Sequence, residues 1–349
     1  MNVPFLPLQG RKMLRKAMFY ELLDDSKVSC YLCSHHCRIA PQKFGFCGVR
    51  ENMDGELYTH AFGEVIAANP DPVEKKPLYH FLPGTYSFSI AAPGCNFHCG
   101  FCQNWQISQL SEHSPRLSEK QELSPSDIVR SAKEVGCRSI SYTYTEPTIF
   151  FEYAYETAKE AKENGLYNVF VTNGFMTPEP LNTIQPFLDA CNVDLKSFRD
   201  DFYRKICKGR IEPVLESIRL MKKLDIWVEI TTLVIPGQND TDEELESMAR
   251  FIASIDRSMP WHISRFHPDY QFGWAEATTP DILRKAHEIG KAAGLQFVYL
   301  GNLRGENRSI LCPNCGAVVL ARSDTSILGA NLKGNRCGSC GQTVPGVFE

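Results

Sequence analysis

Short hydrophobic runs alternate with amphipathic stretches through the middle of the chain. Six runs have the length and composition of buried strands, at residues 87–91, 139–144, 168–172, 191–195, 226–234 and 262–266, and a seventh run at 296–300 extends the series. Alternation of strands with helices is typical of a mostly parallel sheet that packs its helices outside. The pattern therefore predicts an α/β fold.

The stretch 124–136 carries the clearest helix signals. Ser124 is a favourable N-cap residue, and Pro125 suits the first helical position. Ile128 and Ala132 share a helix face because they lie four residues apart. Further helices are predicted over residues 150–163, 240–255 and 279–294. About six strand–helix units can curl into an open, partial (β/α)6 barrel, in which the chemistry collects at the carboxyl ends of the strands.

The two ends of the chain lack this alternation. We expect three parts: a cysteine-rich, metal-binding N-terminal segment at 1–84, the partial barrel at 85–301, and a zinc-ribbon-like tail at 302–349. A tail of under about 50 residues is too small to hold a stable core alone. A metal bound there would supply folding energy.

Composition and charge narrow the class of protein. A chain of 349 residues with 43% hydrophobic and 22% charged residues is typical of a globular protein and argues against a disordered or coiled-coil one. The net charge of -4 offers no general electrostatic footprint for nucleic acid. We find neither an apolar run of about 18 residues nor a secretory signal, so we expect a cytoplasmic protein that does not enter a membrane.

Eleven of the fourteen cysteines fall into three tight groups. The groups are Cys30, Cys33, Cys37 and Cys47; Cys95, Cys99 and Cys102; and Cys312, Cys315, Cys337 and Cys340. In a chain of this length without a secretory signal, such groups indicate reduced metal ligands more than disulfides. The single cysteines Cys137, Cys191 and Cys207 are expected to be small buried hydrophobic residues.

The central group follows the first predicted strand with the spacing C-x3-C-x2-C. Three thiolates are one short of the four that usually hold a [4Fe-4S] cluster, so one iron would stay open for a substrate to bind. Two alternatives remain: a zinc ion held by Cys95, Cys99 and Cys102 and completed by His98, or thiols that hold no metal. The sheet context and the aromatic Phe101 before the last cysteine favour the open cluster.

The run 94–105 resembles the cluster-binding loop of the radical S-adenosylmethionine (SAM) superfamily, in which the residue before the third cysteine is usually aromatic. The resemblance implies that the methionyl amine and carboxylate of SAM chelate the open iron. It also implies that an electron from the reduced cluster cleaves SAM to methionine and a 5'-deoxyadenosyl radical. Nearly the whole chain resembles the pyruvate formate-lyase-activating-enzyme branch, and most closely the AmmeMemoRadiSam system radical SAM enzymes.

This resemblance implies a role for residues at the ends of the second and third strands. Glu146 stands where relatives hold the methionyl ammonium, although a carboxylate at a helix start is the alternative. Thr172 and Asn173 resemble the turn that contacts the ribose, although Asn-Gly is also an ordinary turn. Relatives often have Asp before this turn as part of a cation site, whereas this chain has Val171. The resemblance therefore does not extend to a monovalent-cation site.

The later strands end in further candidates. Lys196 matches a lysine that relatives place near the methionyl carboxylate, and Asp194 lies on the same face of its strand. A surface salt bridge between the two is the alternative. His267 matches a histidine near the adenosine, and a solvated loop histidine is the alternative. With Phe101, these residues complete the expected SAM-binding set.

The flanking cysteines predict two further metal sites. Cys312, Cys315, Cys337 and Cys340 form two C-x2-C pairs that are each followed by glycine, which is the pattern of a zinc ribbon with a closed all-thiolate site. Rubredoxin-like iron or an auxiliary cluster is the alternative there. Cys30, Cys33, Cys37 and Cys47 are compatible with zinc or with a second [4Fe-4S] cluster that relays electrons.

The sequence thus predicts a radical SAM enzyme that abstracts hydrogen from a substrate not yet identified. The resemblance implies a reducing electron donor of the flavodoxin or ferredoxin type, a glycyl residue on a protein partner as substrate, and association with proteins of the Ammecr and Memo families. An RNA-modifying enzyme is one alternative, but residues 302–349 hold only five Lys or Arg against three Asp or Glu. A non-enzymatic metal-binding scaffold or redox sensor is the other.

Overall fold

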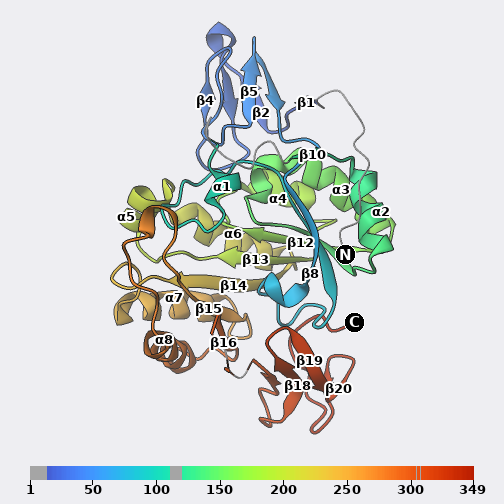
Figure 1. Cartoon of the computed structure of the whole chain (residues 1–349), viewed down its shortest axis with the longest axis vertical. Helices are drawn as coiled ribbons and strands as arrows, with labels where there is room; N and C mark the ends of the chain where they lie inside the picture. The colour runs from blue at the N-terminus through green and yellow to red at the C-terminus, as the bar shows by residue number, and fades with distance from the viewer. Residues whose placement is uncertain (1–13, 111–119, 304, 307) are drawn as a thin grey trace.

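The computed structural model describes residues 14–110, 120–303, 305–306 and 308–349. Some residues of the two predicted flanking segments lie outside the described residues. They are residues 1–13 of the segment 1–84, and residues 304 and 307 of the segment 302–349. Figure 1 shows three parts: small antiparallel sheets of the N-terminal segment at the top, the α/β barrel in the middle, and the tail at the bottom. The predicted fold class is confirmed.

An eight-stranded sheet forms the core of the barrel, in the order β16-β15-β14-β13-β12-β11-β9-β8. Its strands are β8 (Ala67–Pro72), β9 (Tyr86–Ala91), β11 (Ser139–Tyr142), β12 (Tyr167–Thr172), β13 (Ala190–Asp194), β14 (Trp227–Val234), β15 (Trp261–Arg265) and β16 (Val298–Gly301). Seven strands from β9 to β16 run parallel, and β8 pairs antiparallel with β9. All carboxyl ends of the parallel strands therefore meet at one edge.

The six predicted strands and the seventh run are confirmed as β9 and β11 to β16. β11 ends at Tyr142 rather than at the predicted Tyr144, because Tyr144 adopts a left-handed φ of 64° that no strand can contain. β8 was not predicted. Its sequence holds Pro70 and Pro72, which sheets tolerate at an edge strand because proline cannot donate to the ladder.

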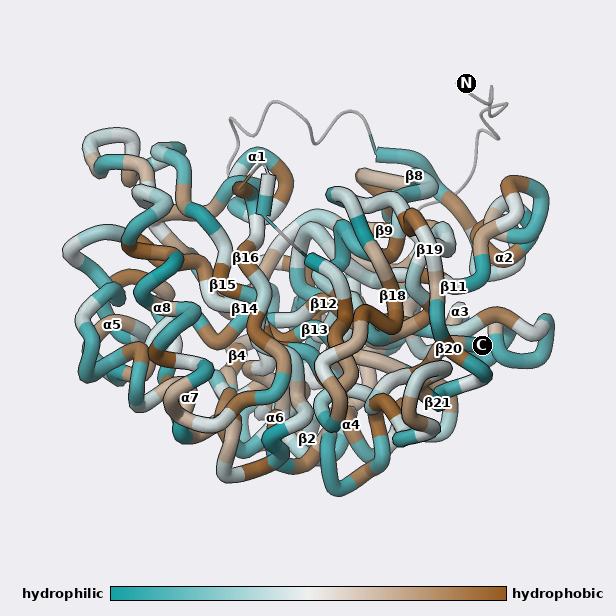
Figure 2. The backbone as a smooth tube through the Cα atoms, turned by 90° about the horizontal axis from the view of Figure 1, so that it is seen from below, coloured by the Kyte–Doolittle hydropathy of each residue, from teal (hydrophilic) through white to brown (hydrophobic). Residues whose placement is uncertain are grey.

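Helices connect the parallel strands and cover the outside of the sheet (Figure 1). They are α1 (Trp105–Ser108), α2 (Pro125–Glu134), α3 (Phe151–Glu163), α4 (Pro178–Ile184), α5 (Asp200–Phe202), α6 (Glu212–Lys223), α7 (Asp242–Ile255) and α8 (Pro280–Ala292), with a π-helical turn at Tyr203–Cys207 and 3-10 turns at Asp24–Ser26, Val73–Lys75, Pro147–Phe150 and Tyr270–Phe272. Ser124 and Asp127 form a reciprocal capping box at the start of α2, as the sequence predicts for Ser124. Figure 2 shows hydrophobic and hydrophilic residues alternating along these outer helices, which is the pattern of helices that bury one face.

No helix in the described part of the chain combines the length and the apolar character that crossing a membrane requires.

The N-terminal segment folds as short antiparallel strands. They are β1 (Arg15–Lys16), β5 (Arg50–Met53) and β6 (Glu56–Thr59) in one sheet, β2 (Tyr20–Leu22), β3 (Val28–Cys30) and β4 (Arg38–Ile39) in a second, and β7 (Glu64–Val65) paired with β10 (Gln121–Glu122). A buried ion pair between Arg50 and Glu152 of α3 fixes this segment to the barrel. Both side chains are almost fully buried, so loss of either would leave an uncompensated charge.

The segment 73–82 packs against the inner strands of the barrel. Glu229 of β14, which is fully buried, accepts hydrogen bonds from the backbone N–H groups of Tyr79 and His80. Leu78 and Phe81 form a buried cluster with residues of β12 and β13. This segment therefore lies against the strands whose carboxyl ends carry the site described below.

The tail is anchored on the same segment. It consists of β17 (Ile310–Leu311), β18 (Val318–Ser323), β19 (Ser326–Ala330), β20 (Leu332–Lys333) and β21 (Arg336–Cys337). His80 Nδ1 lies 2.7 Å from the Pro345 carbonyl oxygen, and His80 Nε2 lies 2.7 Å from the Tyr299 hydroxyl. Arg322 donates to the Tyr79 carbonyl oxygen. The buried imidazole of His80 thus joins the tail to the barrel.

We expect His80 to make the stability of the protein depend on pH. Burial lowers the pKa of His80 to about 4, whereas an unfolded histidine titrates near about 6.5. The unfolded state then binds the proton first, so the stabilisation is complete above about pH 6.5 and is lost as the pH falls toward about 4. Calorimetry should show a larger drop in Tm between about pH 7 and about pH 5 for the wild type than for His80→Gln. Equal drops in the two proteins would contradict this assignment.

Candidate active site

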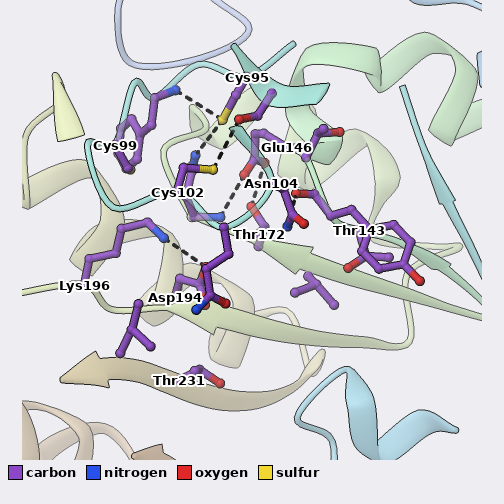
Figure 3. Close-up of a pocket in the computed structure, with 18 of the residues that line it drawn as sticks. Cys95, Cys99, Cys102, Asn104, Thr143, Glu146, Thr172, Asp194, Lys196 and Thr231 are labelled. Atoms are coloured by element: carbon purple, nitrogen blue, oxygen red, sulfur yellow. Dashed lines mark hydrogen bonds and ion pairs between the residues drawn. The ribbon is translucent and has the colours of Figure 1, made fainter. Parts of the chain in front are cut away.

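The loop after β9 brings three thiols to one cavity of about 300 Å³. Cys95, Cys99 and Cys102 all line this cavity, and Figure 3 shows them together beside the strand ends. Gly94 permits the tight path because its φ is 104°, a conformation that other residues rarely adopt. A hydrogen bond of 2.9 Å from Gly94 N to the Ile107 carbonyl oxygen closes the loop onto α1.

The thiols of the loop fit a group larger than a single ion. Among the described residues, the groups of three or more ligand atoms within 4.8 Å of one another do not include these three sulfurs. His98, the predicted fourth ligand of the zinc alternative, is exposed, stacks on Phe46 and does not line the cavity. The donor set and its spacing therefore fit a [4Fe-4S] cluster with one iron that no side chain of the loop binds.

The electrostatic environment favours a thiolate at Cys99. A hydrogen bond from the buried Cys207 thiol lowers the pKa of Cys99, and the charge of Lys196 lowers it further against the effect of burial. Cys207 belongs to the π-helical turn, which is fixed to the loop by a hydrogen bond from His98 N to the Cys207 carbonyl oxygen. Cys95 differs, because burial and the nearby Glu146 raise the pKa of its thiol. A bound cation would be needed to keep Cys95 ionised.

Glu146 lines the cavity at the end of β11 and is 1% exposed. One carboxylate oxygen accepts hydrogen bonds from Thr148 N and Oγ1 and from Thr172 Oγ1, the last at 2.7 Å. The other oxygen accepts a hydrogen bond of 2.8 Å from Asn173 N. Burial raises the pKa of Glu146, and these hydrogen bonds oppose that shift. Glu146 thus ties the end of β11 to the end of β12 while it faces the cavity.

The turn after β12 connects the cavity to the cysteine loop. Thr172 and Asn173 both line the cavity, as does Val171. Asn173 Nδ2 donates to Asn96 Oδ1 at 2.7 Å, and it lies 3.9 Å from the Cys95 sulfur. Asn173 therefore holds the residue next to the first cysteine.

Asp194 and Lys196 face the cavity from the end of β13, next to each other (Figure 3). Lys196 Nζ lies 3.0 Å from Asp194 Oδ2 and 5.8 Å from the centre of the Phe101 ring. Burial alone would lower the pKa of Lys196, but the charges of Asp194 and Cys99 raise it well above its ordinary value. The site therefore contains a permanent cation within reach of the thiolates.

A second cavity of about 800 Å³ adjoins the first. Both are lined by Lys76, Tyr144 and Asn302, among other residues. His267 is exposed and lines only this second cavity, so the structure does not bring it together with the other predicted SAM contacts.

Sequence reasoning missed several residues of the shared wall. Lys76 is 2% exposed, donates to Asp71 at 2.9 Å and lies 4.5 Å from the centre of the Tyr144 ring. Tyr144 also donates to Asp71. No sequence signal links residues 71–76 to the strand ends, but Thr231 and Leu233 could have been found from the alternation along β14.

The four tail cysteines converge as the spacing predicts. All four sulfurs lie within 4.8 Å of one another, with 3.6 Å between Cys312 and Cys340 and 3.8 Å between Cys315 and Cys337. Zinc–thiolate bonds of about 2.3 Å would place the four sulfurs of a tetrahedral site about 3.8 Å apart. The tail therefore has the geometry of a site for one tetrahedral ion.

The N-terminal cysteines lie near one another. Burial raises the pKa of Cys33 well above its ordinary value, and the charges of Cys47, Cys30 and Cys37 raise it further. The four thiols are thus close enough to affect one another. Arg50 donates to the Cys30 sulfur at 3.5 Å.

Comparison with known proteins agrees with this geometry. Residues 89–252 match the sequence profile of the Radical SAM superfamily. A protein of Methanocaldococcus jannaschii named Uncharacterized protein MJ0808 is 44% identical over 335 residues, which cover 95% of this chain and 99% of that protein. The pyruvate formate-lyase-activating enzyme of Staphylococcus epidermidis is 22% identical over 186 residues, which cover 52% of this chain and 74% of that enzyme.

Two solved structures align with this chain at low sequence identity. A radical SAM methyltransferase from Sphaerobacter thermophilus aligns with a TM-score of 0.49 at 17% identity, covering 63% of this chain and 67% of that one. A domain of a pyruvate-formate lyase-activating enzyme from Bacteroides vulgatus aligns with a TM-score of 0.43 at 19% identity, covering 47% and 99%. The matched sequence profile spans the cysteine loop and the strand ends that carry Glu146, Thr172 and Lys196. The chain belongs to the radical SAM superfamily, in the branch that includes the pyruvate formate-lyase-activating enzymes.

Proposed function

We propose that this protein holds a [4Fe-4S] cluster through Cys95, Cys99 and Cys102 and cleaves SAM reductively to begin a hydrogen abstraction. One observation carries the proposal: three thiols share a single cavity with a buried carboxylate, Glu146, and with the cation of Lys196, whose side chain is 15% exposed. When bound, the cluster would supply the open iron and the electron that convert SAM to methionine and a 5'-deoxyadenosyl radical.

The side chains of the cavity would orient the amino-acid end of SAM. Lys196 remains protonated and would pair with the methionyl carboxylate, whereas Glu146 would accept from the methionyl ammonium. Phe101 is 4% exposed and shields this end of the cavity from water. Charge-assisted contacts are stronger in such a desolvated site than in water. Thr172 and Asn173 would meet the ribose.

The substrate would enter through the second cavity. Tyr144 lies in the wall that both cavities share, and its strained backbone is held by the hydrogen bond from its hydroxyl to Asp71. His267 lies at this cavity rather than beside the thiols, so we assign it to the substrate side instead of the adenosine.

The resemblance to activating enzymes favours a glycyl residue of a protein partner as hydrogen donor. A flavodoxin or ferredoxin type of donor would supply the electron, and Ammecr- and Memo-family proteins are candidate partners.

We propose zinc as the metal of the tail. The sulfur separations fit a tetrahedral ion, and the closed all-thiolate set leaves no position for a substrate. Because the tail cysteines lie beside a small buried cluster that includes Tyr79 and Tyr299, the ion would stabilise the packing of the tail on the barrel. The role of this site would be structural.

The variant Cys99→Ala tests the proposed function. We expect it to abolish formation of 5'-deoxyadenosine in reduced, anaerobically reconstituted protein, because the cluster would lose one of three ligands. Zinc in the tail should remain. The matched control is Cys137→Ala, which removes a buried thiol that lines neither cavity and should leave 5'-deoxyadenosine formation unchanged. Unchanged turnover in Cys99→Ala would refute the assignment, and so would a wild type that binds only zinc.

Lys196→Met should weaken SAM binding without loss of cluster iron. A charge-assisted hydrogen bond contributes about 1.5–3 kcal/mol, which corresponds to a rise in the Kd for SAM of about tenfold to a hundredfold. The SAM-induced change in the spin-resonance signal of the reduced protein, titrated against SAM concentration, measures this Kd. Lys205→Met is the control, because Lys205 is 77% exposed and lines neither cavity. An unchanged Kd in Lys196→Met would remove this residue from the SAM site.

A further inference from the structure

The two four-cysteine sets of this chain differ in how far apart their sulfurs lie. All four tail sulfurs lie within 4.8 Å of one another. Within the described residues, neither the N-terminal set nor the central loop contains three sulfurs that meet this limit. The N-terminal set therefore resembles the central loop, and differs from the tail, in that its sulfurs are not drawn together as they are around one ion.

Sulfur spacing distinguishes the two kinds of metal site. One zinc or rubredoxin-like iron draws four thiolates to a common centre, which sets their separation near about 3.8 Å. In a [4Fe-4S] cluster each thiolate binds a different iron at a corner of the cube. The thiolates are then separated by the width of the cube as well as by two iron–sulfur bonds. Four thiols that are not drawn to one centre thus fit a cube better than they fit a single ion.

The surroundings of the N-terminal cysteines have further features that suit a negatively charged group. The Arg50 side chain is 1% exposed and donates to the Cys30 sulfur at 3.5 Å. Arg50 Nε has no hydrogen-bond partner among the described residues, so this buried cation retains an unused donor. The backbone N–H of Phe46 points to the Cys37 sulfur at 3.4 Å. Hydrogen bonds to sulfur of this kind tune the reduction potential of iron–sulfur clusters.

The segment that carries the N-terminal cysteines lies directly against the central cysteine loop. His35 Nε2 lies 2.7 Å from the carbonyl oxygen of Asn96, the residue that follows Cys95. A methyl group added at Gly94 would come within 3.1 Å of the Cys47 carbonyl oxygen, so the backbones that carry Cys47 and Cys95 are in contact. Figure 1 shows that the N-terminal sheets adjoin the barrel next to α1.

The segment that carries the N-terminal cysteines also reaches the surface. Cys33, Cys37 and Cys47 are partly exposed and Cys30 is buried. The central loop is similar, because Cys99 is buried while Cys95 and Cys102 are partly exposed. Phe44 and Phe46, in the loop between Cys37 and Cys47, are 50% and 38% exposed. These two exposed aromatic rings offer an electron-donor protein a contact surface beside the N-terminal cysteines.

We propose that Cys30, Cys33, Cys37 and Cys47 hold a second [4Fe-4S] cluster, closed by four thiolates, which relays electrons to the central cluster. A reduced flavodoxin- or ferredoxin-type donor loses one electron to this second cluster and is oxidised. The electron then crosses the contacts of Cys47 and His35 with residues 94–96, and the second cluster returns to its oxidised state. The central cluster uses that electron to break one carbon–sulfur bond of SAM. The relay rests on the proposed function, whereas the identity of the metal does not.

Metal analysis of the reconstituted full-length wild type tests the proposal without any variant. We expect about eight irons, about eight sulfides and about one zinc per chain. Reduction should give two spin-resonance signals, of which SAM shifts one. A wild type with about four irons and about two zinc ions would overturn the proposal and leave the proposed function standing. About eight irons with no signal that responds to SAM would instead refute the proposed function and keep the second cluster.

Paired variants separate the relay from the metal site. Cys33→Ser combined with Cys37→Ser should lower the iron content from about eight to about four and leave the SAM-responsive signal in place. Formation of 5'-deoxyadenosine should persist with dithionite, which can reduce the central cluster directly, and fall at least about tenfold with a flavodoxin as reductant. Cys315→Ser combined with Cys340→Ser is the matched control and should lose zinc but no iron. Loss of zinc rather than iron from the N-terminal variant would contradict the assignment, and an equal rate with both reductants would contradict the relay.

Discussion

The structure depends on the convergence of three thiols from a short loop at the carboxyl end of a parallel sheet. The loop can follow this path because Gly94 adopts a left-handed φ and because hydrogen bonds to α1 and to the π-helical turn fix both of its sides. Three ligands leave one iron of a cube without a protein donor. The surrounding strand ends then determine what that position can receive, since they place the cation of Lys196 and the buried carboxylate of Glu146 on the walls of the cavity.

The two flanks serve this centre in different ways. The N-terminal segment lies against the loop itself, through His35 and Cys47, and is joined to α3 by the buried pair of Arg50 and Glu152. The tail does not contribute a cysteine to the central cavity. It holds the segment 73–82 through His80 and Arg322, and that segment carries Lys76 into the shared wall of the two cavities. Both flanks thus reach the site, the N-terminal segment through its contacts with the cysteine loop and the tail through the segment 73–82.

Much of this arrangement could be predicted from the sequence because local signals and tertiary structure agree. The parallel strands are hydrophobic runs with clear ends, and polar residues such as Glu146 and Lys196 follow those ends within four residues. Tertiary pairing determines the rest. β8 is rich in proline and becomes a strand only because β9 offers it an edge. Lys76 and Tyr144 are in contact although they are 68 positions apart in the sequence. His267 lies in the loop after its strand, and this loop places it at the second cavity.

Direct detection of SAM at the open iron tests the central claim most directly. The measurement is electron–nuclear double resonance on the reduced, reconstituted protein with SAM labelled with nitrogen-15 at its amino group. The account predicts hyperfine coupling between the cluster and the labelled nitrogen, and loss of that coupling in Cys99→Ala. A reduced [4Fe-4S] signal in the wild type with no coupling to bound, labelled SAM would contradict it.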